Sequence, residues 1–210
     1  MSLIQFNNEY LMFGDEYVGE PWVDPYNPLD LPLNTVRVRT SGGYGPVKCY
    51  AGNSNSPYTT FETATLVPGT TDVYDVYKSG TNFDSFLYGA SNVLEVLGAN
   101  TRGITNMANM FYECYNLASV ALFDTSTVTN MNSMFYRVGY FMSAVPLFDT
   151  SNVMDMSYML WHCVGVESGA LALYQQASTH VQTHVATFED CGSNTIAGAA
   201  ELAQIPDDWK

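Results

Sequence analysis

Basic residues are scarce in this sequence. Its 210 residues include 7 Lys and Arg against 21 Asp and Glu, which gives a formal net charge of −14. Binding to phosphate depends mainly on contacts from Lys and Arg, so this balance argues against nucleic acid and anionic membranes as partners. The acidity instead favours the solubility of an aromatic-rich surface.

The sequence also lacks a long apolar run near its N-terminus. The first basic residue is Arg37, and the longest early apolar run is Tyr10–Phe13. Such a run is far shorter than the core of a signal peptide or a membrane span, so we expect no export signal and no membrane insertion. Apolar residues nevertheless make up 47% of the chain, which predicts a folded core rather than disorder.

Cysteines are few, and recognisable catalytic motifs are missing. Four cysteines in 210 residues argue against a disulfide scaffold, and we expect them to act as small buried hydrophobic residues. A disulfide between Cys163 and Cys191 stays open. The sequence contains no Gly-rich phosphate loop, no Gly-x-Ser-x-Gly and no His-Glu-x-x-His, so we expect neither an enzyme nor a cofactor.

One stretch of sequence recurs three times, beginning at Val96, Val120 and Val145. Weaker matches at the same spacing extend the pattern from Phe83 to Cys191. Self-similarity at such a period is typical of a solenoid, in which each repeat packs on its neighbours. We also predict short helices at Ala170–Ala177 and Thr195–Gln204, which would cover the end of the array.

Apolar residues hold equivalent positions in successive repeats. Methionines at i and i+3 predict a helical or 3₁₀ turn whose side chains point inward. The recurring sets are Val96/Val120/Val145, Ile104/Val128/Val153, Met107/Met131/Met156, Met110/Met134/Met159 and Phe111/Phe135/Leu160.

The part of the chain before the repeats has a different composition. Four β-rich segments separated by turn residues predict a small antiparallel β domain. They are Val36–Arg39, Val47–Tyr50, Thr59–Leu66 and Val73–Tyr77. The charged segment Val36–Arg39 is typical of an edge strand. We predict a β-hairpin attachment module at 1–20, a Pro-rich linker at 21–33, the β domain at 34–80 and the repeats at 81–210.

Polar residues with possible catalytic or metal-binding roles have local alternatives. Asp124 and Asp149 begin equivalent Asp-Thr-Ser corners, where we expect them to cap backbone N–H groups; paired-carboxylate catalysis is the alternative. His180 and His184 have a spacing that suits zinc, with Cys163 and Cys191 as further ligands. Solvated loop histidines are the favoured interpretation, so we expect no metal.

Aromatic and charged residues vary between the repeats at positions that we expect to be exposed. Such residues dominate binding hot spots, although they also fill gaps in cores, and stacking on sugar rings is a further option. An extra residue around Val138–Met142 predicts a bulge on the binding face. The candidate binding residues are Tyr112, Tyr115, Tyr136, Arg137, Tyr140, Phe141, Tyr158, Trp161 and His162.

The strings Leu122–Phe135 and Leu147–Val153 resemble the BspA-type repeat, the leucine-rich-repeat-like module of bacterial surface proteins and Mycoplasma-type lipoproteins. Val138 and Leu160 depart from the usual Cys and Phe of that repeat. The resemblance implies a right-handed solenoid and a role in adhesion or protein recognition, without enzymatic activity. The predicted fold is therefore α+β. It combines a short leucine-rich-repeat-like solenoid, with repeats of about 24–25 residues, and a preceding small antiparallel β domain with an N-terminal β-hairpin.

The predicted function is non-catalytic recognition or adhesion, with a protein or glycan on a bacterial surface as the partner. The short array and the N-terminal hairpin also resemble proteins of phages that infect gut bacteria, and lysis releases a virion protein that has no signal peptide. We therefore place a virion fibre, tail or decoration protein first, docked to other virion proteins through residues 1–33, and a bacterial cell-surface adhesin second. A purely structural assembly protein is the third alternative, and we expect a homo-oligomer.

Overall fold

The structure, a computed structural model, describes residues 12–13, 16–17, 29–41, 47–50, 58–60, 64–139 and 142–210. The strands in this part of the chain are β1 (Met12–Phe13), β2 (Glu16–Tyr17), β3 (Thr35–Thr40), β4 (Lys48–Tyr50), β5 (Tyr58–Thr60), β6 (Ala64–Leu66), β7 (Val73–Tyr77), β8 (Val93–Asn100) and β9 (Ser119–Val120). The helices are α1 (Ala170–Ala177), α2 (Ile196–Leu202) and the 3₁₀ turn η1 (Asp207–Trp209).

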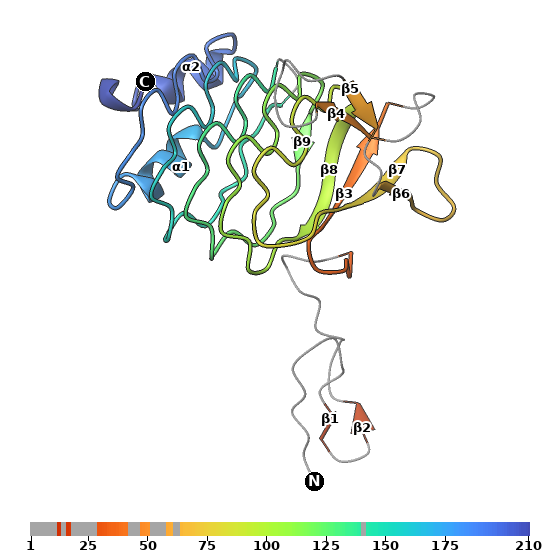
Figure 1. Ribbon diagram of the computed structural model, residues 1–210. Helices are drawn as coiled ribbons and strands as arrows, with labels where there is room; N and C mark the ends of the chain where they lie inside the picture. The colour runs from red at the N-terminus through yellow and green to blue at the C-terminus, as the bar shows by residue number, and fades with distance from the viewer. Residues whose placement is uncertain are drawn as a thin grey trace.

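Five strands form a mixed sheet in the order β6-β7-β3-β8-β9 (Figure 1). All neighbours are antiparallel except β8 and β9, which are parallel. In β3 the valines Val36 and Val38 are buried, while Arg37 and Arg39 alternate with them on the other face. This period of two is what a half-buried strand requires.

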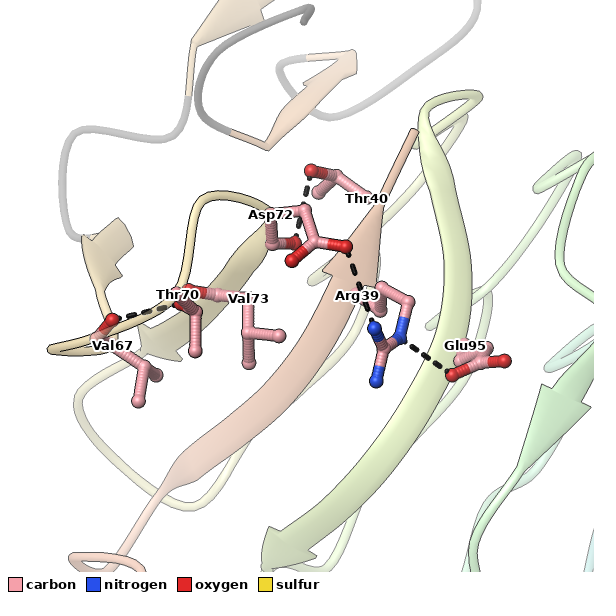
Figure 2. Close-up of polar contacts among 7 residues, drawn as sticks. All are labelled: Arg39, Thr40, Val67, Thr70, Asp72, Val73 and Glu95. Carbon is pink, nitrogen blue, oxygen red and sulfur yellow. Dashed lines mark hydrogen bonds and ion pairs between the residues drawn. The ribbon is translucent and has the colours of Figure 1, made fainter. Parts of the chain in front are cut away.

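The prediction that Val36–Arg39 is an edge strand is wrong, because β3 lies between β7 and β8. Carboxylates on neighbouring segments balance both of its arginines. Arg37 forms a two-point ion pair with Asp75, directly opposite it on β7, at 2.6 and 2.7 Å. Arg39 lies between Asp72 and Glu95, at 3.4 and 2.9 Å, as Figure 2 shows. Paired in this way, a charged strand tolerates an interior position in the sheet.

Two further strand pairs, β1–β2 and β4–β5, are antiparallel and separate from the five-stranded sheet. The β1–β2 pair falls within the predicted attachment module, most of which lies outside the described residues. The β-rich segments predicted from sequence thus contain strands β3 to β7. The longest strand, β8, comes after residue 80 and pairs with β3, so the sheet includes segments from both sides of that expected boundary.

Residues 81–191, which we call the turn region, contain mostly turns besides β8, β9 and α1 (Figure 1). Successive segments meet at isolated parallel bridges, which are Asn82↔Asn106, Asn106↔Asn130, Asn130↔Asp155 and Asp155↔Thr183. At each of the first four bridge residues a side-chain oxygen accepts the backbone N–H of residue i+2, as in Asn106 to Ala108 at 2.9 Å. These local bonds favour turns over strands.

The prediction of a leucine-rich-repeat-like solenoid is wrong. The structure is instead a small mixed sheet of five strands with two short helices, and within the described residues β8–β9 is its one parallel strand pair. The stretch Val96–Asn100, expected to belong to the first repeat, joins the antiparallel sheet through β3. The later segments turn too often to form strands, since residues such as Asn109 and Ser133 have left-handed backbone conformations at φ of 55° and 53°.

The core predictions within the turn region are confirmed at every recurring apolar position except Val120, which is partly buried. Four of the five sets are between 0% and 1% exposed, and in the fifth Val96 and Val145 are 2% and 5% exposed. The methionine pairs close i to i+3 turns, as in the 3.2 Å bond from the Met134 N–H to the Met131 carbonyl. Helix α1 has the predicted bounds, and α2 begins after Thr195, whose hydroxyl accepts the Gly198 N–H. The sheet and these helices therefore enclose one continuous apolar core.

Candidate functional site

Four aromatic side chains from successive segments of the turn region stack in a row that we call the aromatic ladder: Tyr88, Tyr112, Tyr136 and Trp161. Their ring centroids are 4.6, 4.4 and 4.6 Å apart in chain order, and neighbouring rings are within 8° of parallel. Tyr88 is 8% exposed and the other three are half-buried. The row thus lies at the boundary of core and solvent, with Tyr112, Tyr136 and Trp161 partly exposed.

The backbone after each ladder residue sets this spacing. Gly89, Glu113, Arg137 and His162 all have left-handed φ angles, between 54° and 64°. The N–H of each of these residues donates to a backbone carbonyl in the next segment at 2.7 to 2.9 Å. The acceptor is the next ladder residue for the first three, and Glu189 for His162. Three of these four residues carry side chains, so each left-handed conformation costs about 1–2 kcal/mol, which the inter-segment bonds offset.

Residues with left-handed backbone also form a second row, the charged row, beside the ladder: Glu113, Arg137, His162 and Asp190. Arg137 lies 3.5 Å from the Glu113 carboxylate. His162 Nδ1 lies 2.9 Å from Asp190 Oδ2, although the two atoms are not aligned for a hydrogen bond. The side chains are partly exposed, so these contacts contribute little to stability but present charges of both signs to solvent.

Contacts between the two rows fix their relative position. The Arg137 guanidinium lies 6.0 Å from the Tyr136 ring centroid and 5.5 Å from that of Trp161. The His162 imidazole stacks on the Trp161 indole at 3.8 Å, and Trp161 Nε1 donates to Glu189 Oε2 at 2.9 Å. Cation–π contacts and stacking of this kind hold side chains in one arrangement and so preorganise a surface.

Burial, together with its tyrosine neighbours and Glu113, raises the pKa of Tyr112 above that of a free phenol. Its hydroxyl stays protonated at physiological pH, as that of a free phenol does.

The predicted binding residues separate into three groups. Five of them form or adjoin the ladder, and they are Tyr112, Tyr136, Arg137, Trp161 and His162. Tyr115 and Tyr158 are 46% and 39% exposed but lie outside the ladder. Tyr140 and Phe141 lie outside the described residues. The structure therefore brings the first group together on one surface and leaves Tyr115 and Tyr158 outside it.

Sequence reasoning missed Tyr88, Glu189 and Asp190. It recognised Glu113 as a variable position of the first repeat but did not count it among the candidate binding residues. Tyr88 lies one repeat length before Tyr112, in a segment that already aligned with the first clear repeat. Glu189 occupies the position of Tyr112 in the last partial repeat. The alignment from Phe83 to Cys191 already included both ends of the two rows, and comparing the variable positions in its first and last segments would have found them.

The alternative polar candidates have local partners. Asp124 Oδ1 accepts the Ser126 N–H at 3.0 Å and Asp149 Oδ1 accepts the Ser151 N–H at 2.9 Å, which confirms the predicted caps. Hydrogen bonds from the Ser151 hydroxyl and, to a smaller extent, from its N–H lower the pKa of Asp149.

The two histidines considered as zinc ligands contact different parts of the chain. His180 Nε2 lies 2.6 Å from the Thr150 carbonyl, whereas His184 stacks on Trp209 at 4.0 Å and its Nδ1 lies 3.2 Å from the Asp208 carbonyl. In the described part of the chain, no three His, Cys, Asp or Glu side chains are grouped closely enough to hold a metal ion.

Three of the four cysteines have described side chains: Cys114, Cys163 and Cys191 are buried and none of them is in a disulfide, as predicted for small core residues. Burial raises the pKa of Cys163 well above its usual value and that of Cys191 to about 12. The Cys163 thiol donates to the Phe135 carbonyl at 2.9 Å. The pair considered for a disulfide is thus unbonded and shielded from solvent.

Comparison with known proteins places most of the chain in a protein family. Residues 69–197 match the family described as "Mycoplasma protein of unknown function, DUF285". No curated protein and no solved structure matches the chain. No helix among the described residues is long and apolar enough to cross a membrane.

The match is compatible with the surface protein expected from the repeats, and it supports neither adhesion nor a virion in particular. It includes the whole aromatic ladder and the whole charged row. Because it spans well over half of the 210 residues, the chain belongs to the family of Mycoplasma proteins of unknown function, DUF285.

Proposed function

We propose that the protein is a non-catalytic recognition protein that binds its partner through the aromatic ladder and the charged row. The observation that carries this proposal is the coincidence of the two rows on one partly exposed surface. Tyr, Trp and Arg are the residues most enriched in binding hot spots. Rigid aromatic side chains also lose little conformational entropy when they contact a partner.

The ladder limits which contacts a partner can make. Tyr112 and Tyr136 each have a neighbouring ring on both faces, so a sugar ring cannot stack on them. Their edges and hydroxyl groups, together with Arg137 and Glu113, instead offer hydrogen bonds and charge. We therefore propose a polar partner on a cell surface, either a protein or a glycan bound through its hydroxyl groups.

The protein is proposed to be non-catalytic because the side chains considered for acid–base chemistry are engaged in local contacts. Asp124 and Asp149 cap turns, and His180 lies against a backbone carbonyl. A general acid or base needs a free position within hydrogen-bond reach of a substrate.

We propose the outer surface of a cell as the setting, with self-association into a homo-oligomer and attachment through residues 1–33. Brief protease treatment of intact cells that produce the protein should remove it. A virion setting is the alternative, in which the protein co-purifies with phage particles instead.

The test compares two variants of the full chain for binding to a panel of intact bacteria. The edge variant (Tyr112→Phe, Tyr136→Phe, Arg137→Gln) removes polar groups from the ladder surface but keeps the stacked rings. The control variant (Tyr115→Phe, Tyr158→Phe) makes the same hydroxyl deletions outside the ladder. We expect the edge variant to bind roughly ten-fold more weakly or worse, and the control variant to bind like the parent.

Treating the cells first with protease or with periodate separates a protein partner from a glycan. Equal losses in the edge and control variants would contradict the assignment of the surface. The absence of saturable binding by the parent to any cell would contradict recognition itself.

A purely structural role is the second candidate, and one observation favours it. The ladder rings use their faces to stack on each other, which stabilises adjacent segments without any partner. A structural ladder predicts that the edge variant assembles and binds as the parent does.

A further inference from the structure

Two parallel pairs of aromatic rings join the same segments of the turn region but differ chemically. Phe111 and Phe135 stack with centroids 5.3 Å apart, fully buried. Tyr112 and Tyr136 stack with centroids 4.4 Å apart and an interplanar angle of 6°, half-buried. Because the phenol rings are nearly parallel, their ring carbons lie close to van der Waals contact. A phenol ring, unlike a phenyl ring, loses an electron and a proton readily.

We propose that Tyr112 and Tyr136 are an oxidative cross-linking site, which a one-electron oxidant such as a peroxidase with hydrogen peroxide converts to dityrosine. Each phenol gives up one electron and its hydroxyl proton and becomes a phenoxyl radical. The two radicals couple through the ring carbons next to the oxygen-bearing carbons. The hydrogen on each coupled carbon then moves to the oxygen and restores two phenols. Two electrons and two protons leave in all, and they reduce one hydrogen peroxide to two waters.

The ladder favours this pair over other tyrosines for three reasons. The distance between its ring centroids is the shortest in the ladder, so each radical meets the other ring at a very high effective concentration. Both residues are partly exposed, whereas Tyr88, on the other side of Tyr112, is 8% exposed. The two phenol rings also lie side by side within 6° of parallel, and burial followed by the Tyr136 phenol raises the pKa of Tyr112.

The product would be a covalent bond between two segments that are otherwise joined by backbone hydrogen bonds. The Glu113 N–H already donates to the Tyr136 carbonyl at 2.8 Å, so the two side chains leave the backbone side by side. The new bond closes a loop from Tyr112 to Tyr136 and lowers the entropy of the unfolded chain. Denaturant unfolding of the cross-linked protein should therefore have a higher midpoint.

The sequence makes the link easy to locate. Trypsin cleaves after Arg102 and Arg137 and releases both tyrosines in residues 103–137, while Tyr88 leaves in residues 79–102. A second protease that cleaves on the N-terminal side of Asp splits this peptide before Asp124. Tyr112 is then in residues 103–123 and Tyr136 in residues 124–137. The two halves stay joined only when the chain is cross-linked between them. Tyr115 shares the first half with Tyr112, so a Tyr115→Phe variant assigns the link.

The experiment treats the folded full chain, at low micromolar concentration, with peroxidase and limiting hydrogen peroxide. We expect dityrosine fluorescence, a monomer that has lost two hydrogens, and joined halves after the double digest. Tyr112→Phe and Tyr136→Phe keep the stack and should each lower the yield roughly ten-fold or more. The control variants Tyr115→Phe and Tyr158→Phe should leave it unchanged. In urea the monomeric product should disappear.

Three results would overturn the proposal. The first is dityrosine found only in dimers, in proportion to protein concentration. The second is a monomer linked at another pair of tyrosines. The third is oxidation of Tyr115 and Tyr158 with no link between Tyr112 and Tyr136.

Discussion

Phe135 and Tyr136 are consecutive residues with different roles. Each stacks on its counterpart in the preceding segment, Phe135 on Phe111 and Tyr136 on Tyr112. The Phe111–Phe135 pair is fully buried among the methionine rows, and its stacking contributes to the core. The Tyr112–Tyr136 pair lies closer together but at the surface, beside a row of charges. The same backbone register therefore supports two rows of rings with different roles. The buried Phe111–Phe135 pair, here called the inner row, stabilises the fold. The aromatic ladder, here called the outer row, holds polar groups in fixed positions.

The largest expected effect comes from breaking the inner row. Phe135→Ala removes a buried ring and leaves a cavity between Phe111 and Phe148, so we expect a loss of about 3–5 kcal/mol in the free energy of unfolding. Urea unfolding followed by tryptophan fluorescence measures it. A loss below that of the outer-row variant Tyr136→Ala would contradict the comparison.

Alkaline pH also acts on the buried core beside the inner row. Burial raises the pKa values of Cys163 and Cys191, so above about pH 8.5 the unfolded chain releases thiol protons that the folded chain retains. Stability is thus full below that pH and falls as pH rises toward the folded pKa values, by up to about 1.4 kcal/mol per pH unit for each thiol. Urea midpoints between pH 8 and 10 should fall less steeply in a Cys163→Ala, Cys191→Ala variant. If the urea midpoints of the parent and of the variant fall equally steeply with pH, the two thiols are not the cause of the alkaline loss of stability.

In the outer row, Tyr136→Ala should cost less than Phe135→Ala, about 1–2 kcal/mol. The ring is half-buried, and the variant loses stacking on Tyr112 and Trp161 rather than a fully packed core position. Tyr136→Phe keeps the stacking and serves as the matched control, with an unfolding free energy, measured in urea, close to that of the parent. A cost for Tyr136→Phe as large as that for Tyr136→Ala would mean that the hydroxyl, and not the stack, stabilises the row.

The smallest expected effect is at a turn cap outside both rows. Contacts with Ser151 lower the pKa of Asp149, so its stabilising contribution is full above the unfolded value of about 3.9 and is lost as pH falls through the folded value. Asp149→Asn keeps an oxygen for the cap and should change stability at pH 7 by no more than about 0.5 kcal/mol. Its stability should also decline less than that of the parent in acid, as thermal unfolding at pH 3–5 would show. An identical acid profile would exclude Asp149 as a contributor.

The buried apolar sets and the turn caps could be predicted from the sequence because each rests on a local, periodic signal. Met107, Met131 and Met156 recur at equivalent positions, and burial follows from apolar character at that spacing. The Asp124 and Asp149 caps follow from side-chain chemistry within a single turn. Tyr112, Tyr136 and Trp161 were found as variable aromatic residues, although not as one stack.

The arrangement of the strands could not be predicted, because it depends on partners far away in the sequence. Nothing within Val96–Asn100 shows that β3, much earlier in the chain, would pair with it, so the segment was assigned to the first repeat. The same long-range pairing places a charged strand inside the sheet, where Asp75 and Glu95 balance its arginines. Local turn-forming bonds then keep the later segments from becoming strands.

The measurement that tests the central claim most directly determines stability and cell binding together for the edge variant (Tyr112→Phe, Tyr136→Phe, Arg137→Gln). An outer row that serves recognition predicts an unfolding free energy within about 1 kcal/mol of the parent and roughly ten-fold weaker binding to intact bacteria. A variant that binds like the parent but is less stable would contradict the claim. It would mean that both rows of rings stabilise the fold and that neither serves recognition.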